Sequence, residues 1–353
     1  MRAEERKTFH YTGIGDPEAE ELLNRTLPQI GRDIAALHLN GLAGVYLGGG
    51  YGRGEGGVFR DTDGRVRLYN DLDFFAVADC CGFSAKKRID SALRTVSEKW
   101  SAQLGVEVDF GPVKNRFELA KAGHTLMFQE LRHGYVTVYG DADLLKAELP
   151  DLNPAFLSLP EALRLMLNRG MGLLLAREAM KEPSADTGFI LRNLNKCVLG
   201  CGDALLISCG KYAWSIHDRI RILAGLDDLP EVLDRLYPEA VRFKLEPTAD
   251  LPADPADAWF RLRDLWNAVL LRILDLKAGT PDIRPVLHQL CRREKACSWK
   301  NILRVLAKTR RLDISSISPD EPRVRLLAEL YEVLNSPDPA LSSRLHRTWQ
   351  AFN

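Results

Sequence analysis

The sequence lacks a long hydrophobic run and an excess of charge of either sign. Its longest stretch without a charged residue, residues 34–52, contains six glycines, which favours a helix end, a strand and a loop over a membrane span. Residues 1–13 have no apolar core like that of a secretory signal peptide, so we expect a cytoplasmic protein without a membrane partner. The 48 basic and 48 acidic side chains balance, which excludes coating of nucleic acid by bulk charge but leaves a local basic face open.

The sequence also lacks a metal-binding pattern of cysteine or histidine. Its seven cysteines are odd in number and irregularly spaced, which is typical of reduced thiols rather than of a disulfide framework. Cys197, Cys201 and Cys209 fall on one predicted helix, and one helix cannot surround a tetrahedral zinc ion. The seven histidines show no ligand spacing. We therefore expect neither disulfides nor a zinc site.

What the sequence has is the composition of a globular protein of two domains. It contains 353 residues, of which 46% are hydrophobic and 27% charged. Up to about residue 150, short strand patterns alternate with helical ones. Asp16 and Pro17 predict the start of a helix over residues 17–39. The other elements expected here are strands at 43–47, 66–77, 106–110 and 135–139, a hairpin at 57–69 and a helix at 86–104.

After residue 150 the hydrophobic pattern becomes helical. Helices are predicted at 160–182, 188–209, 216–226, 231–241, 256–278, 284–310, 321–334 and 340–351. A proline-rich loop at 246–256 suggests a subdivision of this half. The fold class that we predict is α+β, with a mixed-sheet domain over residues 1–150 followed by an all-helical domain over 151–353.

The segment that points to chemistry is a glycine-rich turn followed by two aspartates. Gly49 and Gly50 lie in the turn, where bare backbone N–H groups could approach a phosphate, and Arg53 could add positive charge. Asp71 and Asp73 lie two residues apart in a predicted strand and therefore point to the same face. Two carboxylates held close together are costly unless a cation lies between them, and Mg²⁺ prefers such oxygen ligands.

A third carboxylate is available on another predicted strand, at residues 106–110. Glu107 and Asp109 share one face of that strand, and Val106, Val108 and Phe110 share the other. Carboxylates that hold metal ions beside a phosphate-binding turn are the groups that metal-assisted phosphoryl or nucleotidyl transfer requires.

Together these residues resemble the DNA polymerase β-like nucleotidyltransferase superfamily. Its pattern is a strand, a Gly-Gly or Gly-Ser turn, Asp-x-Asp and a third acid on a separate strand. Within it, the chain is similar to the small bacterial branch related to kanamycin nucleotidyltransferase, which has a helical C-terminal domain. The resemblance implies that Gly49 and Gly50 form the phosphate-side loop. It also implies that Asp71 and Asp73 are metal ligands. Asp109, the third acid, would either bind a metal ion as well or help to deprotonate the acceptor hydroxyl.

The resemblance covers about residues 20–145 and extends more loosely into the helical half. The sequence departs from the family pattern in the distance between turn and aspartates. Twenty residues separate Gly50 from Asp71, more than is usual in the family. We assign the excess to the predicted hairpin at 57–69.

The helical half contains two further candidate features. Lys196 and Asp203 are seven residues apart and share a helix face, so either Lys196 binds nucleotide phosphate or the two form an ion pair. Residues 284–311 carry nine basic side chains and one acid. Four of the basic residues fall along one face: Lys300, Arg304, Lys308 and Arg311. This face could bind RNA, a phosphorylated acceptor or an acidic protein, but a solvated surface is the favoured interpretation.

The predicted activity is the Mg²⁺-dependent transfer of NMP from NTP to a hydroxyl acceptor, with release of pyrophosphate. ATP is the first choice of donor, and two Mg²⁺ ions are expected, for which Mn²⁺ could substitute. Asp71 and Asp73 would bind the metal ions, Asp109 would orient or deprotonate the acceptor, and the turn with Arg53 would hold the β and γ phosphates.

Three interpretations of the acceptor stay open. A small molecule such as an aminoglycoside or a sugar is the first choice, because the helical half could close a pocket. A tRNA or a protein hydroxyl is the second, and the basic face is its only support. The third is a nucleotide sensor without catalysis. The sequence does not specify the base preference or the oligomeric state.

Overall fold

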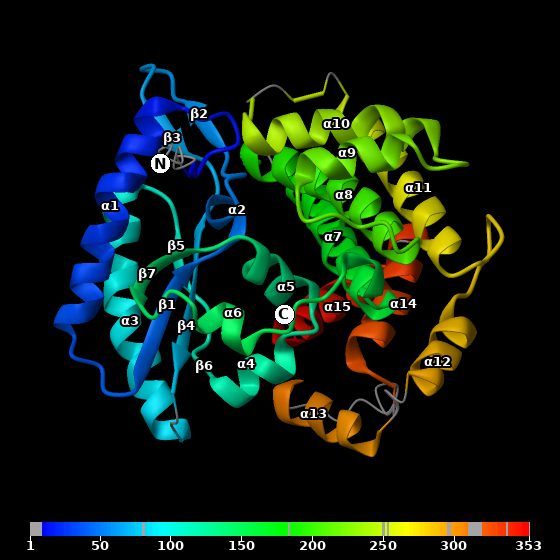
Figure 1. The fold of residues 1–353 in the computed structure, drawn as a ribbon. Helices are drawn as coiled ribbons and strands as arrows, with labels where there is room; N and C mark the ends of the chain where they lie inside the picture. The colour runs from blue at the N-terminus through cyan, green and yellow to red at the C-terminus, as the bar shows by residue number, and fades with distance from the viewer. Residues whose placement is uncertain are drawn as a thin grey trace, which may run out of the picture. The chain divides into compact units, whose positions relative to one another are not determined.

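The protein is described by a computed structural model, which covers residues 9–79, 82–182, 184–248, 251–252, 254–294, 298–309, 320–336 and 338–352, without the side chains of residues 304 and 309 (Figure 1). The chain forms two compact units. Unit 1 contains Met1–Leu157 and two short later segments, Trp214–Ile216 and Val241–Thr248. Unit 2 contains the remainder of the chain from Ser158 onward. The predicted boundary at 150/151 thus falls inside unit 1, and the prediction did not include the two later segments.

The predicted α+β class is confirmed. The structure is 63% helical, with a small mixed sheet and a helical C-terminal region. Within the described ranges, no helix is long and apolar enough to cross a membrane.

Unit 1 is built on a sheet with strand order β5-β4-β1-β7. Its strands are β1 (Leu42–Leu47), β4 (Leu72–Ala78), β5 (Val108–Phe110), β6 (Lys114–Asn115) and β7 (Val136–Gly140). The central strand β1 pairs antiparallel with β4 and β7, whereas β4 pairs parallel with β5 and with β6. The mixed sheet therefore places the residues of β4 directly beside those of β5.

Several helices accompany the sheet among the described residues of the segment before residue 158. They are α1 (Pro17–Ala36), α2 (Gly49–Gly52), α3 (Phe83–Leu104), α4 (Arg116–Ala122), α5 (Leu126–His133) and α6 (Leu144–Glu148). The Asp16 carboxylate accepts hydrogen bonds from the N–H groups of Glu18 and Ala19, which confirms the predicted start of α1. The helix ends at Ala36 rather than at residue 39, since His38 has a positive φ of 47°.

The sheet carries a separate hydrophobic core on each face. Leu72 and Phe74 of β4 pack with α1 and α3. Phe75 and Val77 point the other way and pack with α4, α5 and α6. Because side chains alternate along a strand, Asp73 shares the face of Phe75 and Val77.

The predicted hairpin is confirmed as a two-stranded ribbon. Strand β2 (Val58–Arg60) pairs antiparallel with β3 (Val66–Leu68). The single strand predicted at 66–77 is wrong, because residues 69–71 separate β3 from β4. At this break the Tyr69 and Asn70 N–H groups donate to the Tyr51 hydroxyl, and the Tyr69 N–H also donates to the Gly57 carbonyl at 3.0 Å.

Unit 2 contains most of the helical half of the chain. The helices of this part of the sequence are α7 (Leu159–Ala179), α8 (Thr187–Ser208), α9 (Ile216–Ala224), α10 (Glu231–Leu245), α11 (Pro255–Ile273), α12 (Arg284–Arg293), α13 (Trp299–Thr309), α14 (Pro322–Asn335) and α15 (Pro339–Phe352). The long helix predicted at 284–310 is wrong, since α12 ends with a cap at Glu294. Two buried indoles join α11 to α7: the N–H groups of Trp259 and Trp266 donate to the carbonyls of Leu173 and Met166.

Candidate functional site

Asp73 and Asp109 are direct neighbours on two parallel strands. In the β4–β5 ladder Asp73 is the register partner of Asp109, between the pairs Leu72–Val108 and Phe74–Phe110. The rings of Phe74 and Phe110 stack with centroids 4.9 Å apart. Because these flanking residues belong to the core that contains α1 and α3, both aspartates point to the opposite face of the sheet. The structure thus brings together two of the three predicted carboxylates.

Asp71 lies immediately before β4, where the ladder to β5 begins. The next residue, Leu72, donates its N–H to the Glu107 carbonyl at 2.8 Å. Burial raises the pKa of the Tyr51 hydroxyl, and the negative charge of Asp71 raises that pKa further. The N–H of Asn70, the residue before Asp71, donates to this hydroxyl at 3.4 Å, which ties the start of β4 to the glycine-rich turn. Asp71 therefore lies at the start of the strand that carries Asp73, beside this turn.

The glycine-rich turn lies directly on Asp73. Gly48 donates its N–H to the Asp73 carbonyl at 2.8 Å, and Gly49 has a φ of +59°. A Cβ atom on Gly49 would lie 2.1 Å from Oδ2 of Asp73. Residue 49 must therefore be glycine both for its backbone conformation and for the space that the carboxylate occupies.

Tyr51 joins this turn to both ends of the hairpin. Its side chain is fully buried, and its hydroxyl donates to the Gly57 carbonyl at 2.7 Å. The same hydroxyl accepts from the N–H groups of Tyr69 at 3.1 Å and Asn70 at 3.4 Å. The Asn70 side chain closes the hairpin base by accepting from the Gly57 N–H at 2.8 Å. These contacts fix the residues that lead into Asp71.

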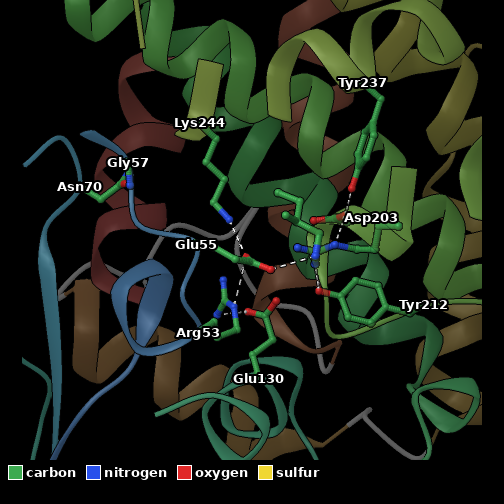
Figure 2. A network of polar contacts seen from close by, with 11 residues as sticks. Arg53, Glu55, Gly57, Asn70, Glu130, Asp203, Tyr212, Tyr237 and Lys244 are labelled. Carbon is green, nitrogen blue, oxygen red and sulfur yellow. Dashed lines mark hydrogen bonds and ion pairs between the residues drawn. The ribbon is translucent and has the colours of Figure 1, made fainter. Parts of the chain in front are cut away.

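Arg53 follows the turn and pairs with two carboxylates (Figure 2). Its Nε lies 3.4 Å from Oε2 of Glu55, and its Nη1 lies 3.2 Å from Oε2 of Glu130 on α5. A Cβ on Gly134 would lie 2.4 Å from Cγ of Arg53, so the arginine stem packs on the bare backbone that ends α5. The predicted role of Arg53 in phosphate binding stays a prediction. A phosphate bound to Arg53 would have to compete with these two ion pairs.

Glu55 is a buried carboxylate with three donors around it. Besides Arg53, it accepts a hydrogen bond from the Ile216 N–H at 2.8 Å and pairs with Nζ of Lys244 at 2.8 Å. These contacts hold the segments 214–216 and 241–248 in unit 1. The fold tolerates the buried Glu55 carboxylate because its charge is paired and hydrogen-bonded.

Unit 2 contains its own half-buried acid, Asp203 on α8. Its Oδ1 accepts from the Tyr237 hydroxyl at 2.6 Å and lies 3.5 Å from Nε of Arg219 (Figure 2). Arg219 also donates to the Tyr212 hydroxyl. Lys196 lies half-buried on the same helix, and its proposed contact with nucleotide phosphate stays a prediction.

The predicted basic face is only partly within the described residues. Arg311 and the side chain of Arg304 lie outside them. Nζ of Lys308 donates to the Ala351 carbonyl at 2.6 Å and lies 4.9 Å from the centre of the Phe352 ring. Lys308 thus contacts the end of α15, which weakens its case as a nucleic-acid ligand.

The carboxylate oxygens of Asp71, Asp73 and Asp109 are the donor type that Mg²⁺ prefers. The bare Cα of Gly49 also leaves space beside the Asp73 carboxylate that a side chain would fill. Over the described ranges, no group of three or more His, Cys, Asp or Glu side chains is already arranged to hold a metal ion. Mg²⁺ in proteins commonly takes one or two carboxylates and completes its shell with water or other oxygen ligands.

Several residues around the turn were missed in the sequence. Glu55, Glu130 and Lys244 carry charge that is unremarkable in the sequence, and only the fold brings them together. Tyr51 could have been recognised, because a large aromatic residue between glycines in a turn must pack somewhere.

No protein-family model matches the chain, and no curated protein matches it significantly.

Proposed function

We propose that the chain is a metal-dependent nucleotidyltransferase of the DNA polymerase β-like type, which transfers NMP from NTP to a hydroxyl acceptor. One observation carries the proposal: Asp73 and Asp109 are register partners on neighbouring parallel strands, and the glycine-rich turn packs on Asp73. The resemblance of the motif order supports it independently. A mixed sheet with β4 between β1 and β5 provides the two strands that the motif requires.

Each residue of the site has a role in this proposal. Asp71 and Asp73 would hold Mg²⁺, which when bound supplies positive charge that offsets the charge developing on the α-phosphoryl group. Asp109 would accept a hydrogen bond from the acceptor hydroxyl, orient it and take up its proton. The turn at Gly49 and Gly50 would leave room for the β and γ phosphates beside the carboxylates.

The acceptor that we propose is a small hydroxyl compound such as an aminoglycoside or a sugar. The alternative of tRNA or a protein rested on the basic face, of which Lys308 contacts α15 instead. A sensor without catalysis would not require a third acid beside Asp73, whereas Asp109 occupies that register position.

Transfer of label from nucleotide tests this function directly. The protein is incubated with each of the four α-labelled NTPs, with Mg²⁺ or Mn²⁺, and with aminoglycosides, sugars, tRNA or a cell extract. The wild type should label an acceptor that the double variant Asp71→Asn/Asp73→Asn does not label. Equal labelling by the two proteins would refute the mechanism. Nucleotide binding without transfer to any acceptor would favour the sensor.

A further inference from the structure

The glycine-rich turn holds the segment of the paired aspartates at both of its ends. Gly48, at the start of the turn, donates its N–H to the Asp73 carbonyl at 2.8 Å. Tyr51, within the turn, accepts a hydrogen bond from the Asn70 N–H at 3.4 Å through its hydroxyl. Only two residues lie between Asn70 and Asp73, and the first of them is Asp71. The position of Asp71 relative to the turn therefore depends on these two contacts.

The hairpin makes the contact through the hydroxyl important. Residues 57–69 lie between the turn and the paired aspartates, and bringing the two ends of such an insertion together costs conformational entropy. The Tyr51 hydroxyl joins these ends, because it donates to the Gly57 carbonyl at 2.7 Å and accepts from the Tyr69 N–H at 3.1 Å. One side chain thus fastens the residues that leave the turn and the residues that lead into β4.

The Tyr51 ring and the Tyr51 hydroxyl have separable roles. The ring is fully buried, and a Cβ on Gly56 would lie 2.1 Å from its Cδ1, so the ring packs on bare backbone. A phenylalanine would keep this packing. Without the hydroxyl, the Tyr69 N–H would still donate to the Gly57 carbonyl, which it contacts at 3.0 Å. Loss of the hydroxyl should therefore act most on Asn70, the residue before the first aspartate.

We propose that Tyr51 is a positioning residue of the candidate site, whose hydroxyl fixes Asp71 beside the turn through the backbone of Asn70. This inference rests on the proposed function, since it takes Asp71 as a metal ligand. The hydroxyl contacts neither metal ion nor nucleotide in this role. The role also accounts for the long spacing between the turn and the aspartates, because the hydroxyl bridges the hairpin that fills this spacing.

Binding of Mn²⁺ to the full chain tests this role with a readout other than activity. Dissociation constants of Mn²⁺ alone are measured by water-proton relaxation for the wild type, Tyr51→Phe, Asp71→Asn and the double variant. Tyr51→Phe should bind Mn²⁺ about fivefold more weakly, the factor that one hydrogen bond of ordinary strength contributes. Because the hydroxyl acts through Asp71, the double variant should bind Mn²⁺ like Asp71→Asn.

Tyr46→Phe is the matched control. Tyr46 is also fully buried, and its hydroxyl donates to a backbone carbonyl, that of Asp141, at 2.6 Å. Tyr46→Phe should lower the urea midpoint about as much as Tyr51→Phe does, and it should leave Mn²⁺ binding unchanged. A Tyr51→Phe protein with wild-type Mn²⁺ affinity, or equal weakening in the two phenylalanine variants, would overturn the positioning role. A further fivefold loss in the double variant would overturn it too.

Two further checks keep the outcome decisive. If Asp71→Asn binds no Mn²⁺, the comparison of Tyr51→Phe with Tyr46→Phe decides alone. Urea unfolding shows whether each variant folds, and Asn70→Ala, which removes the side chain that accepts from the Gly57 N–H, replaces a Tyr51→Phe protein that does not. A wild type that neither binds Mn²⁺ nor transfers nucleotide would overturn the proposed function as well, whereas the outcomes named for the variants bear on the positioning role alone.

Discussion

Two groups of acidic side chains flank the glycine-rich turn of unit 1, and they face opposite kinds of neighbour. Glu55 faces Arg53, Lys244 and a backbone N–H. Asp73 has a second acid, Asp109, as its register partner. A carboxylate surrounded by cations contributes to the folded structure, whereas two carboxylates placed side by side cost stability unless a cation joins them. The predictions below test this difference, with Glu55 as an acid that maintains the fold and with Asp73 and Asp109 as acids of the proposed site.

The strand pair gives the largest expected effect. Asp109→Asn removes the proposed proton acceptor and the repulsion of Asp73, so transfer activity should fall by about 1,000-fold. The free energy of unfolding should stay the same or rise, by up to about 1 kcal/mol. Radiolabel transfer and urea denaturation measure the two quantities. Glu107→Gln, two residues earlier, is the control and should change neither. A large loss of stability in Asp109→Asn would break the comparison.

The turn gives the next effect. Gly49→Ala places a Cβ where the Asp73 carboxylate lies, so the carboxylate must move, and we expect about a 100-fold loss of activity from its displacement. Gly64→Ala is the matched control, because Gly64 also has a positive φ, of 75°, but has no atom within 4 Å of the added Cβ. Both variants should lose about 1 kcal/mol of stability from backbone strain. Equal activity of the two would contradict the contact with Asp73.

Glu55, the acid that is held by cations, should affect stability more than activity. Glu55→Gln leaves the charges of Arg53 and Lys244 poorly compensated in a buried place, and we expect a loss of about 2 kcal/mol in the free energy of unfolding. The shift in the urea midpoint measures it. Full stability of Glu55→Gln would show that the ion pairs of Glu55 with Arg53 and Lys244 do not maintain the fold.

The smallest effect concerns His133, whose ring stacks on Trp214 with centroids 4.4 Å apart. Burial lowers the pKa of His133, and the charge of Asp151 only partly opposes this. The unfolded chain thus binds the proton more tightly than the folded one. Stability is fully present above the unfolded pKa of about 6.5 and is lost as the pH falls through the lower folded value. Urea midpoints at pH 7.5 and 5.5 should differ less in His133→Gln than in the wild type. An equal difference would remove His133 from the pH response.

Sequence reasoning reached the faces on which the aspartates lie, because the alternation of side chains along a strand depends on local rules. Alternation placed Asp109 opposite Val108 and Phe110, and the sequence Asp-Thr-Asp-Gly at 61–64, which is typical of a turn, predicted the hairpin. It failed where contacts between residues far apart in the sequence determine the structure. Lys244 and Ile216 contact Glu55 across 189 and 161 residues of sequence, so no local pattern could reveal them. The break at residues 69–71 was missed because no turn motif marks it, and the Tyr51 hydroxyl that accepts from the Tyr69 and Asn70 N–H groups is far away in the sequence. The site assignment itself stays a prediction until activity is measured.

The closed base of the hairpin has a practical consequence for engineering. Tyr51 and Asn70 tie its two ends together beneath β2 and β3. The tip, at Gly64, meets open space. Because loop closure becomes only slowly more costly with length, a peptide tag or a small reporter domain could be spliced in at the tip without disturbing Asp71. The same property would let natural variants of different ribbon length share one arrangement of carboxylates.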